Sequence, residues 1–542
     1  MLRISQIRLL PGHSGSELEE KLRKILHLRK SEPLKYQIFK QSVDARKKPE
    51  IYYTYTVDVE TLQESAVFRR VSRQNTKIQK IERAKDRYQF PVHGKEKLSK
   101  RPVIVGAGPA GLFCAWLLAR EGYCPIVLER GAPVRERIRD VQAFWESGKL
   151  NPESNVQFGE GGAGTFSDGK LNTLVKDSCG RNRFVLETFV HFGAPKRILY
   201  EQKPHVGTDI LADVVLNIRK EIQMYGGEIR FHSRLTDIAC VQEPGVQRLR
   251  EIVVNGSEHL AAEVLVTAIG HSARDTFQML YDSGIPMQAK AFAVGVRIEH
   301  PQKMIQEAQY GHALAKNLPA AAYKLSEKLD NGRGVYTFCM CPGGYVVNAS
   351  SEEAHLAVNG MSYSGRDGEN ANSAVIVTVT PEDYGSGHPL AGIGFQRRLE
   401  ALAYKEGRGS VPVQCFGDFC RNRATTGLGA IYPRIKGKFR LANVRAIFPE
   451  ELSDSLEKGI CAMDQKIPGF AREDALLSGV ESRTSSPVRL IRSDTMESGV
   501  KGIYPCGEGA GYAGGIMSAA MDGLKVAEAL IRRYKPVCSR EP

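Results

Sequence analysis

The sequence VIVGAGPAG, residues 103–111, decides the fold of the largest part of this chain of 542 residues. Its first three residues predict a short buried strand, and the LFCAWLLAREG that follows predicts a helix ending at Gly122. Gly106 permits a tight turn out of the strand, Gly108 lets the backbone approach a ligand closely, and Gly111 lets the helix pack close to the strand. The helix N-terminus then directs free N–H groups at a pyrophosphate.

An acidic residue stands where a dinucleotide-binding fold needs one. Glu129 ends the next predicted strand, PIVLE, about 20 residues after Gly106. A carboxylate at this position accepts hydrogen bonds from ribose hydroxyls and disfavours a 2′-phosphate. The strand, glycine turn, helix and acid together predict a Rossmann-like α/β fold that binds a dinucleotide.

Two further glycine clusters bear on which dinucleotide is bound. NVQFGEGGAGTFSDGKLN (155–172) is too rich in glycine for a regular element and can lie flat against a ligand. PCGEGAGYAGG (505–515) precedes a long C-terminal helix, whose N-terminus suits the negative charge of a reduced flavin. The alternative for each cluster is a purely structural loop.

These motifs, with VLVTAIGHSARD (264–275), resemble the flavoproteins of the glutathione reductase superfamily. More narrowly, FGEGGAGTFSDGKL, FAVGVRIEHPQ, FCMCPGGYVV, GENANSAV and GVESRTSSPVR resemble the large FAD-dependent proteins described as NAD(FAD)-utilizing dehydrogenases. The resemblance implies non-covalent FAD, with Glu508 at a position where the wider superfamily mostly has aspartate. The expected cofactor-binding residues are Gly106, Gly108, Pro109, Ala110, Gly111, Glu129, Arg130, Gly161, Gly162, Gly164, Thr165, Ser167, Gly270, His271, Gly507, Glu508, Gly515 and Ile516.

A permanent NAD site is not expected. Between residues 150 and 480 only GEGGAG fits the letters of a second dinucleotide motif, and the NVQF before it is too polar for a buried strand. NAD(P)H therefore remains a transient electron donor, and another protein is the alternative donor.

Other candidate residues each allow two interpretations, and no catalytic residue is assigned. His271 either lies near the cofactor or caps the next helix, and Asp168 with Lys170 forms either a proton-handling pair or a loop ion pair. Arg483 and Arg489 either clamp an anion or belong to a charged loop.

The cysteines allow a similar choice. Cys339 and Cys341 point the same way along a strand and are interpreted as buried small residues, with a redox role as the alternative. Cys415 and Cys420 have CxxxxC spacing but lie far downstream of the first glycine motif. No metal site is predicted.

The first hundred residues carry most of the net charge. They contain 23 Lys and Arg against 12 Asp and Glu, whereas the whole chain is +14. Strand and helix patterns there predict a small basic α+β unit, followed by a helix or linker over residues 75–100. Because Tyr53, Tyr55 and Val57 alternate along a strand, we expect one face of this unit to pack on the flavin domain.

The predicted organisation has four segments. Residues 1–95 form the basic α+β domain, 96–290 and 481–542 the two parts of a discontinuous FAD domain, and 291–480 a β-rich cap domain. Average hydrophobic content, scattered cysteines and the lack of a signal peptide or apolar span predict a soluble cytoplasmic protein.

Together these features predict a FAD-dependent oxidoreductase whose substrate the sequence does not name. Two alternatives stay open. The basic domain could bind RNA as part of an RNA-modifying flavoenzyme, although interleaved acids and the lack of an RNP-type motif disfavour nucleic acid. Alternatively, the FAD could be structural or sensory. No membrane partner is expected.

Overall fold

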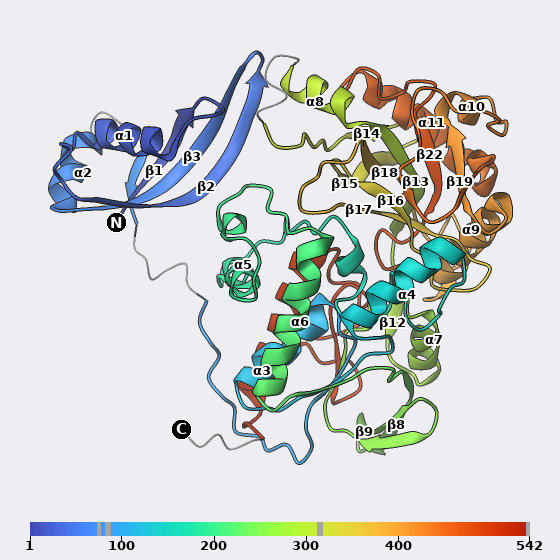
Figure 1. Ribbon diagram of the computed structural model, residues 1–542. Coiled ribbons are helices and arrows are strands. Elements are labelled where there is room, and N and C mark those ends of the chain that lie inside the picture. Colours follow the sequence, from blue (N-terminus) through green and yellow to red (C-terminus); the bar gives the residue numbers. More distant parts are fainter. Residues whose placement is uncertain (73–76, 82–87, 312–317, 538–542) are drawn as a thin grey trace.

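The computed structural model describes residues 1–72, 77–81, 88–311 and 318–537 and is a mixed α/β protein (Figure 1). A small N-terminal unit stands apart from two larger layers. One layer is built on a parallel sheet and the other on a mostly antiparallel sheet, which we call the cap.

The parallel sheet has five strands in the order β24-β11-β5-β6-β7. Its strands are short and, apart from β7, buried, because structure covers both faces. β24 comes from the C-terminal part of the chain and pairs with β11, so the two ends of this layer share one sheet. The strands are β5 (Val103–Val105), β6 (Ile126–Leu128), β7 (Glu228–Arg230), β11 (Leu265–Thr267) and β24 (Ile503–Pro505).

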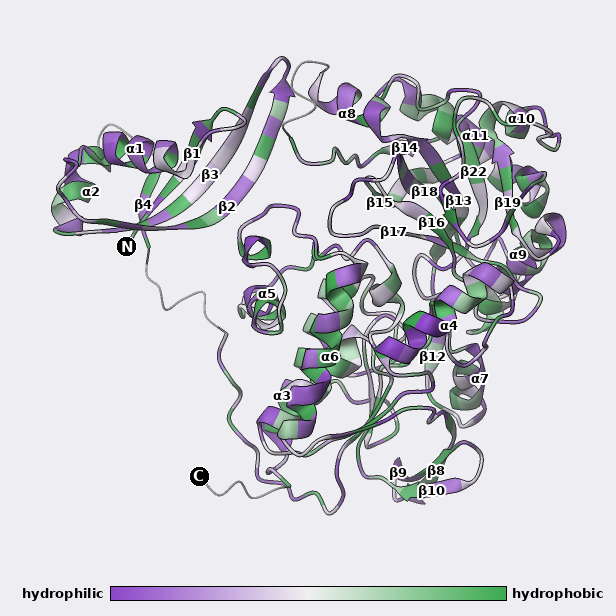
Figure 2. Cartoon of the chain, in the orientation of Figure 1, coloured by the Kyte–Doolittle hydropathy of each residue, from purple (hydrophilic) through white to green (hydrophobic). Residues whose placement is uncertain are grey.

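Helices α3 (Pro109–Arg120), α6 (Thr208–Met224) and α12 (Ile516–Arg533) pack together in this layer. α3 is buried from Ala110 to Ala119, whereas hydrophobic and hydrophilic residues alternate along α6 as in a helix with one face on the core (Figure 2). α3 and α12 approach so closely that a Cβ on Gly523 would lie 2.1 Å from the Ala110 carbonyl oxygen.

Next to this sheet lies a three-stranded antiparallel meander of β8 (Leu235–Glu243), β9 (Val246–Val254) and β10 (Glu258–Ala261). Two further strands of this stretch of chain, β7 before the meander and β11 after it, do not belong to the meander. β7 and β11 instead join the parallel sheet. Helix α7 (Arg274–Asp282) follows, and β12 (Met287–Ala289) pairs with β23 (Val488–Leu490).

The cap is a seven-stranded sheet in the order β14-β15-β18-β13-β22-β19-β21. Its long central strands β13 and β18 are almost entirely buried, and helices α9 (Ala391–Gly407) and α11 (Glu450–Asp464) pack on the sheet. The strands are β13 (Phe292–Pro301), β14 (Ser326–Lys328), β15 (Gly334–Cys341), β18 (Asn370–Val379), β19 (Val411–Cys415), β21 (Phe439–Leu441) and β22 (Leu476–Glu481). Beside it, β16 (Tyr345–Asn348) pairs with β17 (Val358–Met361) and β20 (Ile435–Lys436).

The N-terminal unit has the element order β1, α1, β2, β3, α2, β4 and the sheet order β2-β3-β1-β4, which is the ferredoxin-like arrangement. The Ser14 side chain and Glu17 form a capping box at α1. The bounds are β1 (Leu2–Leu9), α1 (Gly15–Leu26), β2 (Leu34–Lys47), β3 (Glu50–Thr61), α2 (Glu64–Ser72) and β4 (Ile78–Lys80).

The packing of this unit corrects one expectation. Tyr55 and Val57 are buried against the unit's own helices rather than on the flavin domain. The unit contacts the rest of the chain along β2, where the Gln41 N–H donates to the Tyr200 carbonyl (2.7 Å), and at Lys48, whose ammonium group donates to the Ala308 carbonyl.

The sequence predicts a helix or linker over residues 75–100, but the first described part of this segment includes a strand. Residues 78–80 form strand β4, while residues 75–76 and 82–87 lie outside the described residues. Further along, Tyr88 stacks on Phe184 of α5 (Arg181–His191), with ring centroids 4.2 Å apart. Among the helices of the described ranges, none has both the length and the apolarity that a membrane crossing requires.

Candidate functional site

A cavity of about 350 Å³ lies at the carboxyl ends of β5, β6 and β11, where the parallel sheet meets the cap. Val105, Leu128 and Ala268 at these strand ends line it, together with Phe338 and Asn359 of the cap. Doubly wound sheets bind ligands at this edge, and pockets commonly form where domains meet.

The first glycine motif forms one wall. Gly106, Gly108, Pro109 and Ala110 line the cavity, and α3 begins there with Gly108 as an N-cap that carries no side-chain hydrogen bond. Gly106 has φ +100°, and a Cβ on it would lie 2.3 Å from the Ala268 carbonyl oxygen. Gly111 is not a lining residue, because it packs against the Gly106 carbonyl, 1.9 Å from where its Cβ would stand.

The N-terminus of α12 faces the same cavity. Gly514, Gly515 and Ile516 line it, and a Cβ on Gly515 would meet nothing within 4 Å. Gly515 is the N-cap and makes no side-chain hydrogen bond. Two helix N-termini, each with free N–H groups and a partial positive charge, therefore face one cavity, an arrangement that suits a ligand with two separated electronegative groups.

Glu129 is buried at the cavity wall with a carboxylate that is already largely bonded. One oxygen, Oε1, accepts from the N–H groups of Gly131 and Gly159 (both 2.9 Å), and Oε2 accepts from the Ala107 N–H (2.8 Å). Since a carboxylate offers about four acceptor positions, one remains at Oε2. The geometry therefore leaves room for one ribose hydroxyl rather than two.

Arg130 lies beside Glu129 and also lines the cavity. Its guanidinium is paired with Glu153 and Asp275 (both 2.9 Å) and lies 4.1 Å from the centre of the Phe158 ring. These partners hold the side chain flat against the cavity wall.

Sequence analysis missed the residue that organises the second glycine cluster, Arg137 of α4 (Val134–Ser147). Its fully buried guanidinium donates to five backbone carbonyls, and burial lowers its pKa to about 10. The signal was present, because Val134, Arg137, Val141 and Phe144 share one helix face. The five acceptors are the carbonyls of Asn155, Val156, Gly159, Glu160 and Gly162.

This arginine holds the cluster against the first glycine motif. Gly162, Gly164 and Ser167 line the cavity, and a Cβ on Gly162 would lie 3.0 Å from the Gly108 Cα. Gly161 and Thr165 lie behind that surface and touch each other, since a Cβ on Gly161 would lie 2.1 Å from the Thr165 hydroxyl.

His271 lies at the cavity and does not cap a helix. Helix α7 begins after Ala273 with no side-chain cap, whereas the His271 ring contacts Glu508 Oε1 (3.2 Å) and Gln396 Nε2 (2.9 Å). Gly270 and Glu508 also line the cavity. Gly507 supports this turn from outside, where its N–H donates to Asp522 (2.8 Å).

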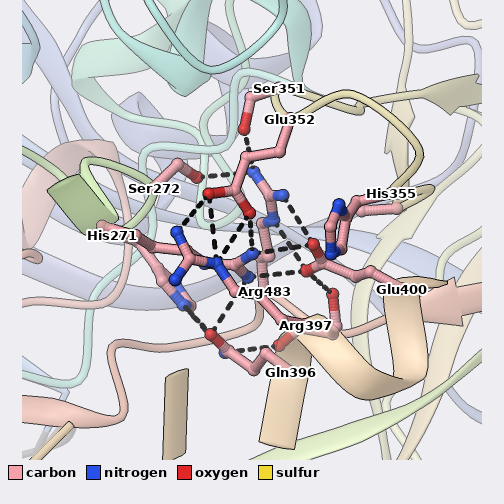
Figure 3. A network of polar contacts seen from close by, with 12 residues as sticks. His271, Ser272, Ser351, Glu352, His355, Gln396, Arg397, Glu400 and Arg483 are labelled. Carbon is pink, nitrogen blue, oxygen red and sulfur yellow. Dashed lines mark hydrogen bonds and ion pairs between the residues drawn. The ribbon is translucent and has the colours of Figure 1, made fainter. Parts of the chain in front are cut away.

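A buried charge network joins this wall to the cap (Figure 3). Glu400 of α9 accepts two hydrogen bonds each from Arg274 and Arg483, and together the two arginines hold the pKa of this carboxylate well below its usual value despite burial. Glu352 pairs with Arg274 and Arg397 at the edge of the network. The Arg483 fork is thus occupied by Glu400, which removes the anion clamp that its sequence position suggested.

Some of the remaining residues that the sequence singled out lie away from the cavity, and others lie at it. Arg489 and the Cys415 and Cys420 thiols are not among the lining residues, and burial raises the pKa of both thiols. Lys170 does line the cavity, and its ammonium lies 3.5 Å from the fully buried Asp168. Burial opposes ionisation of Asp168, but Lys170 and Arg366 outweigh it and lower its pKa.

A carboxyl group and a thiol group of the cap also reach the cavity. Glu481 lies 3.2 Å from the buried Arg297, and burial raises its pKa to about 7 even so. Cys339 lines the cavity beside it. Glu481 was not predicted as a site residue, and for Cys339 a redox role was only the alternative to a buried small residue.

The residues around the cavity fit FAD. The two helix N-termini match a pyrophosphate and a flavin, the bare glycine surfaces leave space that side chains would fill, and Glu129 keeps one acceptor position. Residues 291–484 match the model of a family described as "FAD-dependent protein, C-terminal domain-like", and residues 104–149 match "NAD(P)-binding Rossmann-like domain". The fold and the site therefore define a FAD-dependent protein with a Rossmann-like domain, and FAD is its cofactor.

The chain belongs to the same family as an uncharacterized protein of Clostridium beijerinckii. The two are 49% identical over 544 residues, which cover 98% of this chain and 99% of the relative. Residues 1–60 match a domain of unknown function.

Solved structures share much lower similarity. A flavin-dependent halogenase, CmlS, is 13% identical, with a TM-score of 0.35 over 80% of this chain and 59% of its own. The glycerol-3-phosphate dehydrogenase of Bacillus halodurans, solved with FAD, is 10% identical, with a TM-score of 0.33 over 82% of this chain and 65% of its own. At this level the matches support no functional argument.

Proposed function

We propose that this protein is a FAD-dependent oxidoreductase of the glutathione reductase type, in which the cap supplies the substrate side of the cavity. The observation that carries the proposal is that two helix N-termini, those of α3 and α12, face one cavity that also reaches polar and ionisable groups of the cap. Bound FAD supplies the transfer of an electron pair.

In this proposal the adenosine end lies at Glu129 and Arg130, and the pyrophosphate lies at Gly108 and the first turn of α3. The N–H groups of Gly515 and Ile516 then stabilise negative charge on the reduced flavin. Gly162 and Gly164 provide a flat surface because they carry no side chains. His271 and Gln396 hold Glu508 toward the cofactor.

The cap end of the cavity is where a substrate reaches the flavin. Lys170 presents an ammonium group, Asn359 an amide, and Glu481 a carboxyl whose pKa burial raises to about 7. A carboxyl in that range exchanges protons near neutral pH and can serve as a general acid or base. NADH or NADPH is proposed as a transient donor at this end, without a resident site.

An anaerobic screen tests the proposal. The FAD-loaded protein is mixed in turn with NADH, NADPH and dithiols, and flavin absorbance is recorded; candidate acceptors are then added to the reduced protein. We expect at least one donor to bleach the flavin faster than it bleaches free FAD. Bleaching no faster than that of free FAD by every donor would argue against an oxidoreductase and favour a structural or sensory cofactor.

A further inference from the structure

Strand β15 contains a strained residue at the cavity. The pairing of β15 with β18 shifts register between Phe338 and Cys341, and the extra residue, Cys339, has φ +42°. That left-handed conformation is unfavourable for any residue with a Cβ, and bulges of this kind re-aim a side chain. Here the bulge brings Cys339 to the cavity, while Cys341 is fully buried behind it.

The two thiols are neighbours. The Cys341 thiol donates to the carbonyl oxygen of Cys339, 3.2 Å from the sulfur. Disulfides need Cα atoms within about 7 Å of each other. Residues two apart on a strand are close to that limit, and the bulge bends the chain between these two.

The surroundings of the two thiols shift their pKa values in opposite directions. The neighbouring Cys341 thiol, together with the positive charges of Lys170 and Arg297, lowers the pKa of Cys339 despite its burial. Burial raises the pKa of Cys341. The Arg297 guanidinium, 3.8 Å from the Cys341 sulfur, is anchored by Asn372 (2.9 Å) and Glu481 (3.2 Å).

This combination differs from that of an inert core cysteine. An inert cysteine is surrounded by apolar groups and has a raised pKa, whereas a reactive one has a lowered pKa, a nearby cation and access to a ligand. Cys339 has all three of these features, and Cys341 is placed as its resolving partner. Cys506, buried near Cys114 in the core of the parallel layer, is the inert type, because burial raises its pKa well above the usual value.

We propose that Cys339 and Cys341 are a redox-active pair that exchanges an electron pair with the FAD in the shared cavity. The inference rests on the proposed function. In the oxidising direction both S–H bonds break and one S–S bond forms. The two electrons and two protons that leave the sulfurs convert FAD to its reduced form, and the reverse reaction regenerates the dithiol.

Peptide mapping tests whether the disulfide forms. Trypsin releases residues 334–366 as one peptide, which contains Cys339 and Cys341 and no other cysteine. The FAD-loaded protein is quenched with acid and alkylated, either as oxidised protein or after anaerobic reduction. We expect an unlabelled peptide lighter by two hydrogens from the oxidised protein and a doubly labelled peptide from the reduced protein.

A reductive titration tests whether the pair communicates with the flavin. We expect the oxidised holoprotein to take up two electron pairs per FAD, one for the flavin and one for the disulfide. Cys339→Ser and Cys341→Ser should each take up one pair. Cys461→Ser, a change at an exposed cysteine of α11, is the matched control and should take up two.

Failure of this inference is distinguishable from failure of the proposed function. If the wild-type holoprotein takes up one electron pair per FAD, or the peptide carries two free thiols in every state, the pair is not redox-active although the flavin is. If the protein binds no FAD, the proposed function itself is wrong. Peptide mapping uses the wild-type chain, so it does not depend on whether the serine variants fold.

Discussion

At the scale of single residues, Glu129 has two roles: it accepts hydrogen bonds from the backbone, and it binds the ligand. Sequence analysis predicted only the second role. Its carboxylate accepts one backbone N–H from the first glycine turn, one from the residues after β6 and one from the second glycine cluster. Only the last acceptor position of the carboxylate is left for a ligand. Binding and local stability are therefore linked at this residue.

The replacement Glu129→Gln should weaken both FAD binding and the stability of the apoprotein. The glutamine amide keeps one acceptor oxygen, but its NH₂ group then faces a backbone N–H that had donated to the carboxylate. Loss of such a hydrogen bond to a charged group costs roughly 1.5–3 kcal/mol. We expect FAD affinity to fall on the order of tenfold or more and the apoprotein to unfold at lower urea concentration. Fluorescence titration of apoprotein with FAD and urea unfolding measure the two effects.

Glu136→Gln serves as the control, because Glu136 is half exposed on α4 and its nearest partner is His232 at 3.6 Å. Reduced FAD affinity in Glu129→Gln with unchanged apoprotein stability would contradict the triple backbone contact.

His300 gives a pH-dependent prediction. Burial lowers its pKa to about 4, and its Nε2–H donates to the Phe470 carbonyl (2.7 Å). Because the unfolded value is about 6.5, His300 contributes its full stability above pH 6.5, and this contribution is lost as pH falls toward 4. His300→Gln keeps a donor but does not titrate.

Between pH 7 and pH 5 the wild type should therefore lose about 2 kcal/mol more stability than His300→Gln, as judged from 1.4 kcal/mol per pKa unit. Urea unfolding followed by circular dichroism at the two pH values measures the difference. His388→Gln, at an exposed histidine, should behave like the wild type. Equal losses in the wild type and His300→Gln would mean that this histidine is solvated.

At the scale of elements, the α3–α12 contact links the two ends of the parallel layer. A Cβ at Gly523 would lie 2.1 Å from the Ala110 carbonyl oxygen, so Gly523→Ala must push the helices apart. Overpacking of this kind costs about 1–3 kcal/mol, and Ala110 lines the cavity. We expect a lower melting temperature and weaker FAD retention on gel filtration.

Gly394 of α9 offers a matched control, since a Cβ there would meet nothing within 4 Å. Gly394→Ala should leave FAD retention unchanged and stabilise the helix by about 0.5–1 kcal/mol. Equal effects of the two substitutions would show that close packing at Gly523 is unimportant.

The elements that sequence predicts well are those fixed by local patterns. VIVGAGPAG specifies a strand, a turn and a helix within nine residues, and the observed strand and helix begin at Val103 and Pro109. The number of bonds to Glu129 was not predictable, because one of its donors, the Gly159 N–H, depends on how the second glycine cluster folds back. Arg137 was predictable from its helix face, but its five carbonyl partners were not.

The cap is where local patterns fail most. FCMCPGGYVV looks like a regular strand, and only its pairing with β18 introduces the bulge that turns Cys339 toward the cavity. Likewise, Glu400, which lies 83 residues earlier in the chain, occupies the Arg483 guanidinium and rules out the anion clamp that was one of the two interpretations of this residue. Such partners are set by tertiary packing and leave no trace in short sequence windows.

At the scale of the whole molecule, the N-terminal unit has its own hydrophobic core and touches the rest of the chain mainly along β2. We therefore expect removal of residues 1–80 to leave FAD content unchanged. A flavin spectrum and melting curve of the shortened chain check this. Loss of flavin would mean that the unit stabilises the cofactor domain.

The same unit carries much of the net positive charge of the chain. On its open sheet face Arg3 pairs with Asp58 and stacks on Phe39. Because the cation and the ring already engage each other, we expect only weak, salt-sensitive tRNA binding. Log affinity should fall with log salt by about 0.7–0.9 per phosphate contacted. Sub-micromolar, sequence-selective binding that survives about 150 mM salt would instead favour RNA as the substrate.

The central claim is that the cavity between the parallel layer and the cap holds FAD without a covalent bond. The most direct test is to purify the protein, precipitate it with acid and identify the released flavin by chromatography. The account predicts a yellow protein that releases FAD into the supernatant at about one per chain, and a Glu129→Gln variant that retains less. A colourless protein, release of FMN, or flavin that stays with the precipitate would contradict it.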